Sequence, residues 1–585
     1  MFRKVFLFHI IFFFLLGTLL FLSSSLTFRS TIVHICYALL FFSFFLAAWT
    51  LLVISKQRIL QYILVYCYYN YLFLLYVLFE IGKENLGVPM TLKMIYPYFE
   101  NFSLLTKLIS YQNLIILLIA YILILGVIFY VWNKVYKSVS NDLLTNIKLF
   151  RYKRVLIALS IISIIFLIFK KTYFINKFND HKINEPYLSL IYFDEAFKRQ
   201  KEKGIENSIE FDNYFSSEGN KKNVILIICD ALRPDFFQSQ EKLTPFIDSL
   251  ITSESFISHK NMYSTSAFSF NGISNILSSS RKLYQNNFFI HDLLKKKGYD
   301  INFILSGDMT NFWDLKGHIK TKSVDFYSDG YENFKFGRSD NLNDDKKNIL
   351  SLLDKISPFN ETPTFFYFHM MSVHQISVTY KKYKRFDTGN INLGSSKYDS
   401  ESLTNDYKNR MIQLDDYIRK LYNILKTKGY LEDYVFVITS DHGQSLGENQ
   451  VYFHSKDVNY ESIKIPFIIN TDDLFDSNAV ASQLDIAPTI LKALDLKIPK
   501  TWRGSIISDT IPKTIFQNQG DKYSMIWKNK NSTYQLYFNK VSNKFNLFDI
   551  SLESANRHND ISSLLKKYKL DSLKNILATN FKLKL

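Results

Sequence analysis

The sequence predicts an α/β protein in two parts: an N-terminal five-helix transmembrane domain and an extracytoplasmic domain with a mainly parallel sheet between helices. Three observations predict this. Long apolar segments gather before residue 172 of the 585-residue chain. Short apolar runs then alternate with helical patterns from residue 221 onwards. Acidic, imidazole and hydroxyl side chains follow several of these runs, at the strand ends where open α/β sheets bind ligands.

Five apolar segments make up the predicted membrane domain, residues 1–171. Each is near or above the ~18 apolar residues that mark a spanning helix, and the last is the shortest. The first lacks a small-residue cleavage site, and its apolar run is too long for a signal peptide. A packed core helix would explain any single segment, but five in series favour a membrane domain. The segments are Val5–Leu22, Ile32–Ile54, Ile59–Ile81, Leu114–Trp132 and Val155–Phe169.

The loop charges predict how this domain is oriented. Lysines and arginines precede the first segment and concentrate in every second loop, so the N-terminus is expected inside and the chain after Lys171 outside the cytoplasm. Residues 172–220 are expected to form a linker with an interfacial helix near Leu188–Lys203 or an ordinary linker helix. The net charge of +17 would suit nucleic acid, but an outer location argues against that partner. The charge then fits either attraction to anionic lipid or glycolipid headgroups or an ordinary solvated, lysine-rich surface.

Strand and helix patterns alternate through the outer domain, residues 221–585. The apolar runs have the length and the β-branched residues of buried strands, and the intervening segments have helical periodicity. The predicted strands are Val224–Ile228, Ile301–Leu305, Phe365–Phe368, Val435–Ile438 and Ile465–Ile469. The predicted helices are Leu243–Thr252, Phe288–Lys297, Tyr407–Lys426 and Ala479–Leu494.

Potential metal ligands lie at two of the strand ends. Asp441 and His442 follow one apolar run, and Asp230 closes another. A carboxylate at the end of a buried strand is costly unless it is paired or bound to a metal, although each aspartate could also cap a turn or helix. Carboxylate oxygen together with imidazole nitrogen suits Zn²⁺ or Mn²⁺ better than Ca²⁺.

Further polar side chains could complete a reaction centre. A hydroxyl-rich stretch, residues 263–273, includes Ser266 and Ser269 and could supply a nucleophile that needs a base or a metal for activation. His374 and His454 could hold a phosphoryl group, bind a second metal or protonate a leaving alkoxide. A lysine and an aromatic residue, Lys316 and Trp313, follow another strand and would suit a zwitterionic headgroup.

One motif gives the chain a family resemblance. Residues 440–449, Ser-Asp-His-Gly-Gln-Ser-Leu-Gly-Glu-Asn, with Tyr452 and His454, resemble a string in bacterial phosphoethanolamine transferases of the lipid A-modifying, polymyxin-resistance type. These enzymes belong to the alkaline phosphatase and sulfatase superfamily, and five spans before an outer alkaline-phosphatase-like domain are their architecture. The family usually has glutamate where Gln444 stands. Residues 407–409 and 482–490 are also similar to superfamily segments.

The resemblance implies particular roles for the site residues. Asp230, Asp441 and His442 would bind one catalytic zinc, with a second zinc left open. The nucleophile, also a metal ligand, would be a serine in place of the family's threonine. Counting back from the apolar segment 273–277 favours Ser269, with Ser266 as the alternative.

The resemblance also implies roles for the remaining positions. His374 and His454 would contact the phosphoethanolamine phosphate or a second zinc. Lys316 and Trp313 are assigned to substrate binding through their chemistry. The family's glycine beside the first histidine is replaced here, so the match of His374 rests on its place after a strand.

The expected function is transfer of phosphoethanolamine from phosphatidylethanolamine to an envelope lipid or glycan, with lipid A or the lipopolysaccharide core favoured. The enzyme would be a monomeric, multi-pass protein of the bacterial inner membrane with its catalytic domain in the periplasm, and would not bind nucleic acid. A phosphoglycerol transferase or phosphodiesterase of the same superfamily is the first alternative. A catalytically inert lipid sensor is the alternative of another class. The sequence lacks the Cys- or Ser-x-Pro-Ser-Arg modification signature of sulfatases, which argues against a sulfatase.

Overall fold

The computed structural model describes residues 28–55 and 57–86, part of 115–134, and most of 221–583. The chain forms two compact units, one with the N-terminal helices and one with all described residues from 221 onwards. The predicted domain boundaries and the interfacial helix near Leu188–Lys203 lie outside the described residues and stay predictions. Gaps in the second unit fall at 254, 282–287, 311–314, 339–340, 390, 392–397, 455–456, 472–478, 508–512, 553 and 565–566.

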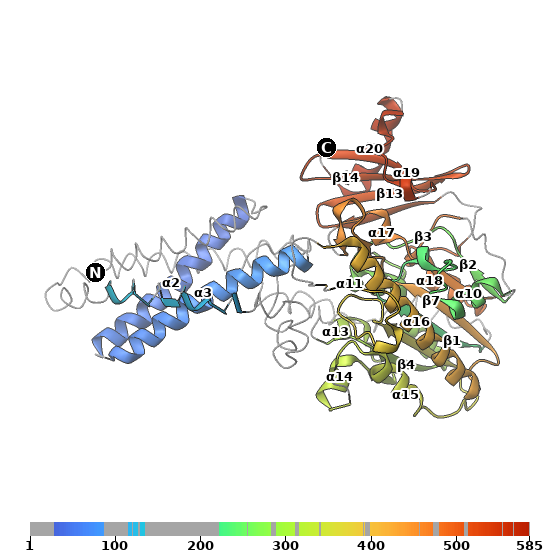
Figure 1. The fold of residues 1–585 in the computed structure, drawn as a ribbon, viewed down its shortest axis with the longest axis horizontal. Coiled ribbons are helices and arrows are strands. Elements are labelled where there is room, and N and C mark those ends of the chain that lie inside the picture. The colour runs from blue at the N-terminus through green and yellow to red at the C-terminus, as the bar shows by residue number, and fades with distance from the viewer. Residues whose placement is uncertain are drawn as a thin grey trace. The chain divides into compact units, whose positions relative to one another are not determined.

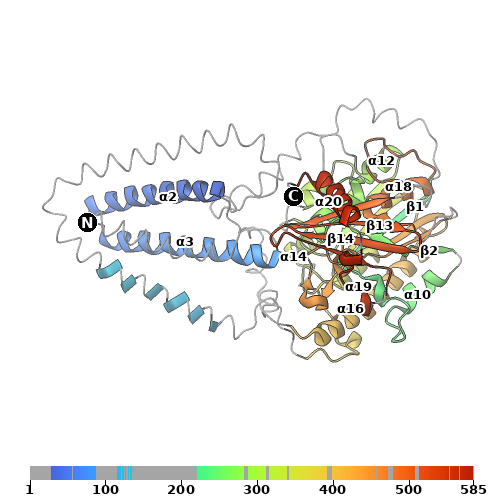
Figure 2. The ribbon, with the colours of Figure 1, turned by 90° about the horizontal axis from the view of Figure 1, so that it is seen from above.

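Two long helices form most of the described part of the first unit. Helix α2 spans Phe28–Ile54 and α3 spans Arg58–Leu86 (Figures 1 and 2). Aromatic rings pack between them, including Phe45 on Tyr68 with ring centroids 4.3 Å apart. These helices cover the second and third of the predicted apolar segments.

The prediction of five spans is not supported by the described residues. Among them, one helical stretch, Arg58–Phe79, is long and apolar enough to cross a membrane, and α2 contributes a shorter apolar stretch, Ala38–Trp49. The predicted segments Val5–Leu22 and Val155–Phe169 lie outside the described residues, and the segment Leu114–Trp132 is described only in part, as helix. The described part of the chain therefore supports one candidate span in place of five.

A seven-stranded sheet organises the second unit, in the order β2-β10-β7-β1-β6-β4-β5. The pairs between β7, β1, β6, β4 and β5 are parallel, whereas β10 runs antiparallel to both β7 and β2. The predicted α/β fold with a mainly parallel sheet is confirmed, and the sheet is mixed at one edge. The strands are β1 (Asn223–Cys229), β2 (Phe256–Ser258), β4 (Asp300–Leu305), β5 (Phe326–Ser328), β6 (Thr364–Met370), β7 (Tyr434–Ser440) and β10 (Phe467–Asn470).

Helices cover both faces of the sheet (Figure 1). On one face, α10 (Pro245–Thr252) and α16 (Ser400–Thr427) share a buried apolar cluster with the central strands. On the other face, α12 (Ile290–Lys296) contacts β4, and α11 (Ser269–Ser278) contacts α12 and α18 (Ile486–Ala493). The apolar central strands are buried on both faces, so polar side chains that bind a ligand are expected at the carboxyl ends of these strands.

A four-stranded antiparallel sheet follows that the sequence analysis does not predict. It comprises β12 (Thr514–Gln519), β13 (Lys522–Asn529), β14 (Ser532–Asn539) and β15 (Lys544–Asp549), with α20 (Lys567–Phe581) packed against it (Figure 2). Ile515, Ile526 and Ile550 from this region join Tyr263 and Tyr460 in one buried cluster. The sheet therefore supports the loops that precede α11 and follow β7.

Candidate active site

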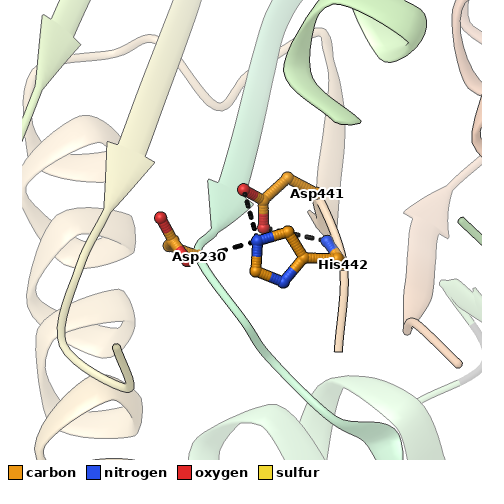
Figure 3. Close-up of side chains that lie close together, drawn as sticks. All are labelled: Asp230, Asp441 and His442. Carbon is orange, nitrogen blue, oxygen red and sulfur yellow. Dashed lines mark hydrogen bonds and ion pairs between the residues drawn. The ribbon is translucent and has the colours of Figure 1, made fainter. Parts of the chain in front are cut away.

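Parallel pairing of β1 and β7 brings the predicted metal ligands together. The register aligns Cys229 with Ser440, so Asp230 and Asp441 each follow the last residue of neighbouring strands. The ligand atoms of Asp230, Asp441 and His442 lie within 4.8 Å of one another, and all three residues are buried (Figure 3). His442 Nε2 is 3.8 Å from Asp230 Oδ1 and 3.5 Å from Asp441 Oδ2.

Hydrogen bonds hold the two ligand-bearing loops against each other. Ser440 Oγ lies 2.6 Å from the Cys229 carbonyl, and it accepts a hydrogen bond of 2.9 Å from the Leu232 amide. The amide of Ala231 donates to Asp441 Oδ1 at 3.2 Å. Ala231 has a positive φ of 64°, a left-handed conformation that is costly for alanine and that these contacts sustain. The loop geometry is thus built into the fold before any ligand binds.

The donor set fits a divalent metal ion. Among the described residues, Asp230 Oδ1 and Asp441 Oδ2 are buried without a hydrogen-bond partner, which is costly for a carboxylate. His442 Nδ1 is 2.9 Å from the Gly443 carbonyl, and a carbonyl only accepts, so Nδ1 carries the hydrogen and Nε2 keeps its lone pair. Two carboxylate oxygens and one imidazole nitrogen are ligands that suit zinc.

The two carboxylates differ in their electrostatic environment. Burial raises the pKa of Asp441, and the nearby Asp230 carboxylate raises it further. Burial also acts to raise the pKa of Asp230, but His374, His369 and His442 outweigh it and hold that pKa below its usual range. A bound dication would stabilise both carboxylates in their charged form.

Ser269 lies beside this cluster, at the start of α11. Its Oγ is 3.0 Å from His442 Nε2 and 3.4 Å from Asp230 Oδ2, and the side chain is half-buried. Ser266 faces elsewhere: its hydroxyl donates to Gln519 Oε1 at 3.0 Å and accepts from Asn271 Nδ2 at 3.2 Å. The described contacts therefore join Ser269, and not Ser266, to the predicted metal ligands.

Close packing fixes α11 against the Asp441 loop. A Cβ on Gly272 would lie 2.4 Å from the Asp441 carbonyl oxygen, so only glycine permits this approach. Gln483 Nε2 donates to the Gly272 carbonyl at 2.8 Å, and Gln483 Oε1 accepts from the Thr265 amide. One glutamine thus links the loop before α11 to α11 itself.

Comparison with known proteins agrees with this geometry. Residues 222–496 match the family model described as Sulfatase, an interval that contains Asp230, Ser269, Asp441 and His442. The match covers just under half of the chain and identifies this region as sulfatase-like. The family match and the candidate Asp and His metal site together support an enzyme of the sulfatase superfamily, either a hydrolase or a transferase.

Individual relatives match shorter parts of the chain. Phosphatidylethanolamine transferase Mcr-2 of Escherichia coli is 35% identical over 112 residues, which are 18% of this chain and 21% of that protein. An N-acetylglucosamine-6-O-sulfatase of Bacteroides thetaiotaomicron is 28% identical over 160 residues, 27% of each protein. The chain thus spans about a quarter or less of these relatives. The periplasmic domain of EptC from Escherichia coli, in complex with Zn, gives a TM-score of 0.40 at 15% identity, covering 55% of this chain and 93% of that one.

Two histidines within the matched region, His374 and His454, lie next to the candidate metal ligands. His374 Nε2 is 4.0 Å from Asp230 Oδ1, and the His454 ring lies 4.3 Å from the His442 ring and 5.1 Å from the His374 ring. Burial lowers the pKa of His374 to about 4, and burial followed by His442 and His374 lowers the pKa of His454. Both imidazoles are therefore expected to be neutral at pH 7.

Gln444 holds His454 in place. Its Oε1 is 2.8 Å from His454 Nδ1, and its Nε2 donates to Gln375 Oε1 at 3.2 Å. Because an amide oxygen only accepts, His454 Nδ1 carries the hydrogen in this arrangement. The residue that departs from the family pattern is thus a direct partner of a predicted site histidine.

Lys316 and Trp313, the residues predicted to bind the headgroup, are not placed at the site by the described contacts. Trp313 lies outside the described residues. Lys316, on α13 (Leu315–Ile319), pairs with Glu332 and lies 4.8 Å from the centre of the Tyr327 ring. Within the described part of the chain, no contact joins Lys316 to the candidate metal ligands, so its role in substrate binding stays a prediction.

Two residues that the sequence analysis does not assign to the site also contact it. His369, inside β6, is fully buried with Nε2 3.5 Å from Asp230 Oδ2. In the sequence, the position of this histidine near the carboxyl end of an otherwise apolar strand could have indicated a site residue. Arg233 follows the Asp230 loop, donates to the Gln444 carbonyl at 2.9 Å and pairs with Glu448 at 2.6 Å. It ties that loop to the segment after His442.

Proposed function

We propose that the protein transfers phosphoethanolamine from phosphatidylethanolamine to an envelope lipid or glycan, by way of a phosphoethanolamine group carried on Ser269. Lipid A or the lipopolysaccharide core is the favoured acceptor. The observation that carries the proposal is the position of Ser269 Oγ, 3.0 Å from His442 Nε2 and 3.4 Å from Asp230 Oδ2. The local similarity to Mcr-2, named as a phosphatidylethanolamine transferase, supports the donor.

Asp230, Asp441, His442 and Ser269 would hold a zinc ion, the cofactor that this donor set suits. When bound, such an ion lowers the pKa of a coordinated hydroxyl and stabilises negative charge on phosphoryl oxygens. The unpartnered oxygens Asp230 Oδ1 and Asp441 Oδ2 support this assignment.

The side chains perform the remaining work in two balanced steps. In the first, the Ser269 hydroxyl gives up its proton as its oxygen bonds to the donor phosphorus, the bond from phosphorus to the diacylglycerol oxygen breaks, and the diacylglycerol oxygen takes up a proton in exchange. In the second, an acceptor oxygen bonds to the same phosphorus, the bond to Ser269 breaks, and the serine regains its proton. Neutral His374, whose Nδ1 accepts from the Ile376 amide, can donate its Nε2–H to a phosphoryl oxygen. Neutral His454, whose hydrogen on Nδ1 is held by Gln444, can accept and pass on a proton at Nε2.

The lipid donor explains why such a domain would sit beside a membrane. The candidate span within α3 would keep the site near its substrate, in the inner membrane with the catalytic domain on the periplasmic side. A monomer suffices for this reaction, because the proposed ligands and nucleophile all come from one chain.

A covalent adduct on the protein is the decisive test. The purified full-length chain is placed in vesicles that contain phosphatidylethanolamine, and its peptides are mapped by mass spectrometry. We expect a phosphoethanolamine adduct on Ser269, release of diacylglycerol, and loss of both in Ser269→Ala. The matched control Ser266→Ala should keep both.

Other results would redirect the proposal. An adduct on Ser266 would contradict the choice of nucleophile. Diacylglycerol release without transfer to an added acceptor would favour the phosphodiesterase alternative, and a phosphoglycerol adduct from phosphatidylglycerol would favour the phosphoglycerol transferase. A protein that neither binds zinc nor turns over lipid would favour the lipid sensor. Glycolipid profiles of cells with wild-type protein or Ser269→Ala would then identify the acceptor.

A further inference from the structure

Strand β6 presents two polar side chains in a row behind the candidate metal site. Tyr367 and His369 are two residues apart, so they lie on the same face of the strand, and both are fully buried. Tyr367 Oη is 3.4 Å from His369 Nδ1, and His369 Nε2 is 3.5 Å from Asp230 Oδ2. A chain of polar atoms thus runs from Tyr367 through His369 to a predicted ligand.

The pairing of β1 with β6 fixes the spacing of this chain. His369 aligns with Ile228, and the Asp230 amide donates to the Met370 carbonyl at 2.8 Å. The backbone of Asp230 therefore cannot move independently of the strand that carries His369. Among the described residues, His369 Nε2 has no hydrogen-bond partner, and the 3.5 Å separation from Asp230 Oδ2 is slightly longer than a good hydrogen bond.

The chemistry of the three groups sets the direction of the hydrogens. An ionised carboxylate only accepts, so a neutral His369 can face Asp230 favourably only with a hydrogen on Nε2. Nδ1 then keeps its lone pair, and the Tyr367 hydroxyl must donate to it. Burial raises the pKa of Tyr367 well above its ordinary value, so the hydroxyl retains its proton.

We propose that Tyr367 and His369 position Asp230 for metal binding: the tyrosine hydroxyl fixes the His369 tautomer, and the His369 N–H holds Asp230 Oδ2. Oδ1, which faces His442 Nε2 at 3.8 Å and lacks a hydrogen-bond partner, is thereby left for the metal. This is the arrangement by which partners of ligating side chains orient metal sites and raise their affinity. The inference rests on the proposed metal site and adds positioning residues to it.

Zinc affinity of the purified full-length protein tests the inference without reference to activity. Affinity is measured by competition with a chromophoric chelator, and thermal unfolding verifies that each variant is folded. We expect His369→Leu to weaken zinc binding about 10- to 100-fold, and Tyr367→Phe to weaken it less. His369→Gln retains an N–H donor and should recover much of the affinity. Tyr299→Phe is the matched control, because Tyr299 is a buried tyrosine just before β4, the strand next to β6, and its hydroxyl donates to the Lys222 carbonyl at 2.9 Å.

The double variant distinguishes a relay from two independent effects. Because Tyr367 acts only through His369, Tyr367→Phe should cost nothing further once His369→Leu is present. Additive losses would overturn the relay, as would unchanged zinc affinity in His369→Leu with wild-type binding intact. An equal loss in His369→Gln and His369→Leu would make His369 a direct ligand and overturn its role as donor. A wild-type protein that binds no zinc would instead contradict the metal site itself.

Discussion

Gly272→Ala tests whether contact between α11 and the Asp441 loop sets the geometry of the site. A Cβ at Gly272 would lie 2.4 Å from Asp441 O and 2.9 Å from both Asp441 C and Asp441 Cβ. Carbon atoms in favourable contact are separated by about 3.5–4.0 Å. The helix and the loop would therefore have to separate by about 1 Å.

This separation would displace both the proposed nucleophile on α11 and a proposed metal ligand on the facing loop. Ser269 lies one turn before Gly272 on the same helix, and the backbone that must give way belongs to Asp441. Overpacking of this kind costs about 1–3 kcal/mol of unfolding free energy. Misplacement of reacting groups by about 1 Å costs about 10²-fold in rate. We expect the loss of rate to exceed what the loss of stability explains.

The measurements are the rate of Ser269 adduct formation, the zinc affinity and the unfolding temperature of the full-length protein. Ser274→Ala is the matched control: it places the same side chain on the same helix, and the Ser274 hydroxyl is buried with no hydrogen-bond partner among the described residues. It should behave as wild type. If Gly272→Ala keeps the wild-type rate and zinc affinity while folded, the close contact does not position the site and the reasoning fails.

Three further predictions follow from buried charges. Glu448→Gln leaves the buried Arg233 guanidinium short of one carboxylate and should lower the unfolding free energy, measured by urea titration, by about 2 kcal/mol. Glu332→Gln removes the partner of Lys316 in a pair that is partly open to solvent, and should cost less, about 1 kcal/mol. Burial raises the pKa of Asp415 to about 6, so the stability from this group is present below about pH 4 and lost as pH rises through about 6. The unfolding free energy of Asp415→Asn, relative to that of wild type, should therefore rise by up to about 3 kcal/mol as the pH increases between those limits. Equal dependence of the unfolding free energy on pH in the two proteins would contradict this. Gln444→Glu adds a carboxylate beside His454 and should raise the number of zinc ions bound per chain, measured by elemental analysis; an unchanged stoichiometry would oppose it.

The strand ends could be predicted because their signal is local. Asp230 and Asp441 each follow an apolar run, and that run predicts a buried strand without knowledge of its neighbours. Parallel packing then brings the carboxyl ends together. The direction of β10 has no such signal, because an apolar run reads the same for parallel and antiparallel pairing, and β10 proves antiparallel to β7.

The C-terminal sheet was missed because its buried face carries polar residues. Ser524 Oγ donates to Gln517 Oε1 at 2.6 Å and accepts from Gln535 Nε2 at 3.1 Å, which links β12, β13 and β14 through fully buried side chains. These bonds satisfy one another only once the strands have paired. Read along the sequence, the same residues interrupt the apolar alternation that predicts a strand.

His369 shows a related limit. The histidine interrupts an apolar run in the sequence, and a single buried histidine is usually structural. Its relation to Asp230 depends on the parallel register of β1 and β6, which aligns it with Ile228, and no local pattern encodes that register. Five spans, by contrast, were predicted from apolar length alone, and the described residues contain one stretch that meets this criterion.

The charge of the site bears on how many metal ions it would hold. Asp230 and Asp441 supply two negative charges, which match one dication. A second ion among His374, His454 and Gln444 would find only neutral ligands, and the amide of Gln444 already spans His454 Nδ1 and Gln375 Oε1. A glutamate at this position, as the resembling family usually has, would supply the missing charge. Gln444 therefore favours one zinc ion, with His374 and His454 left free to contact the phosphoryl group.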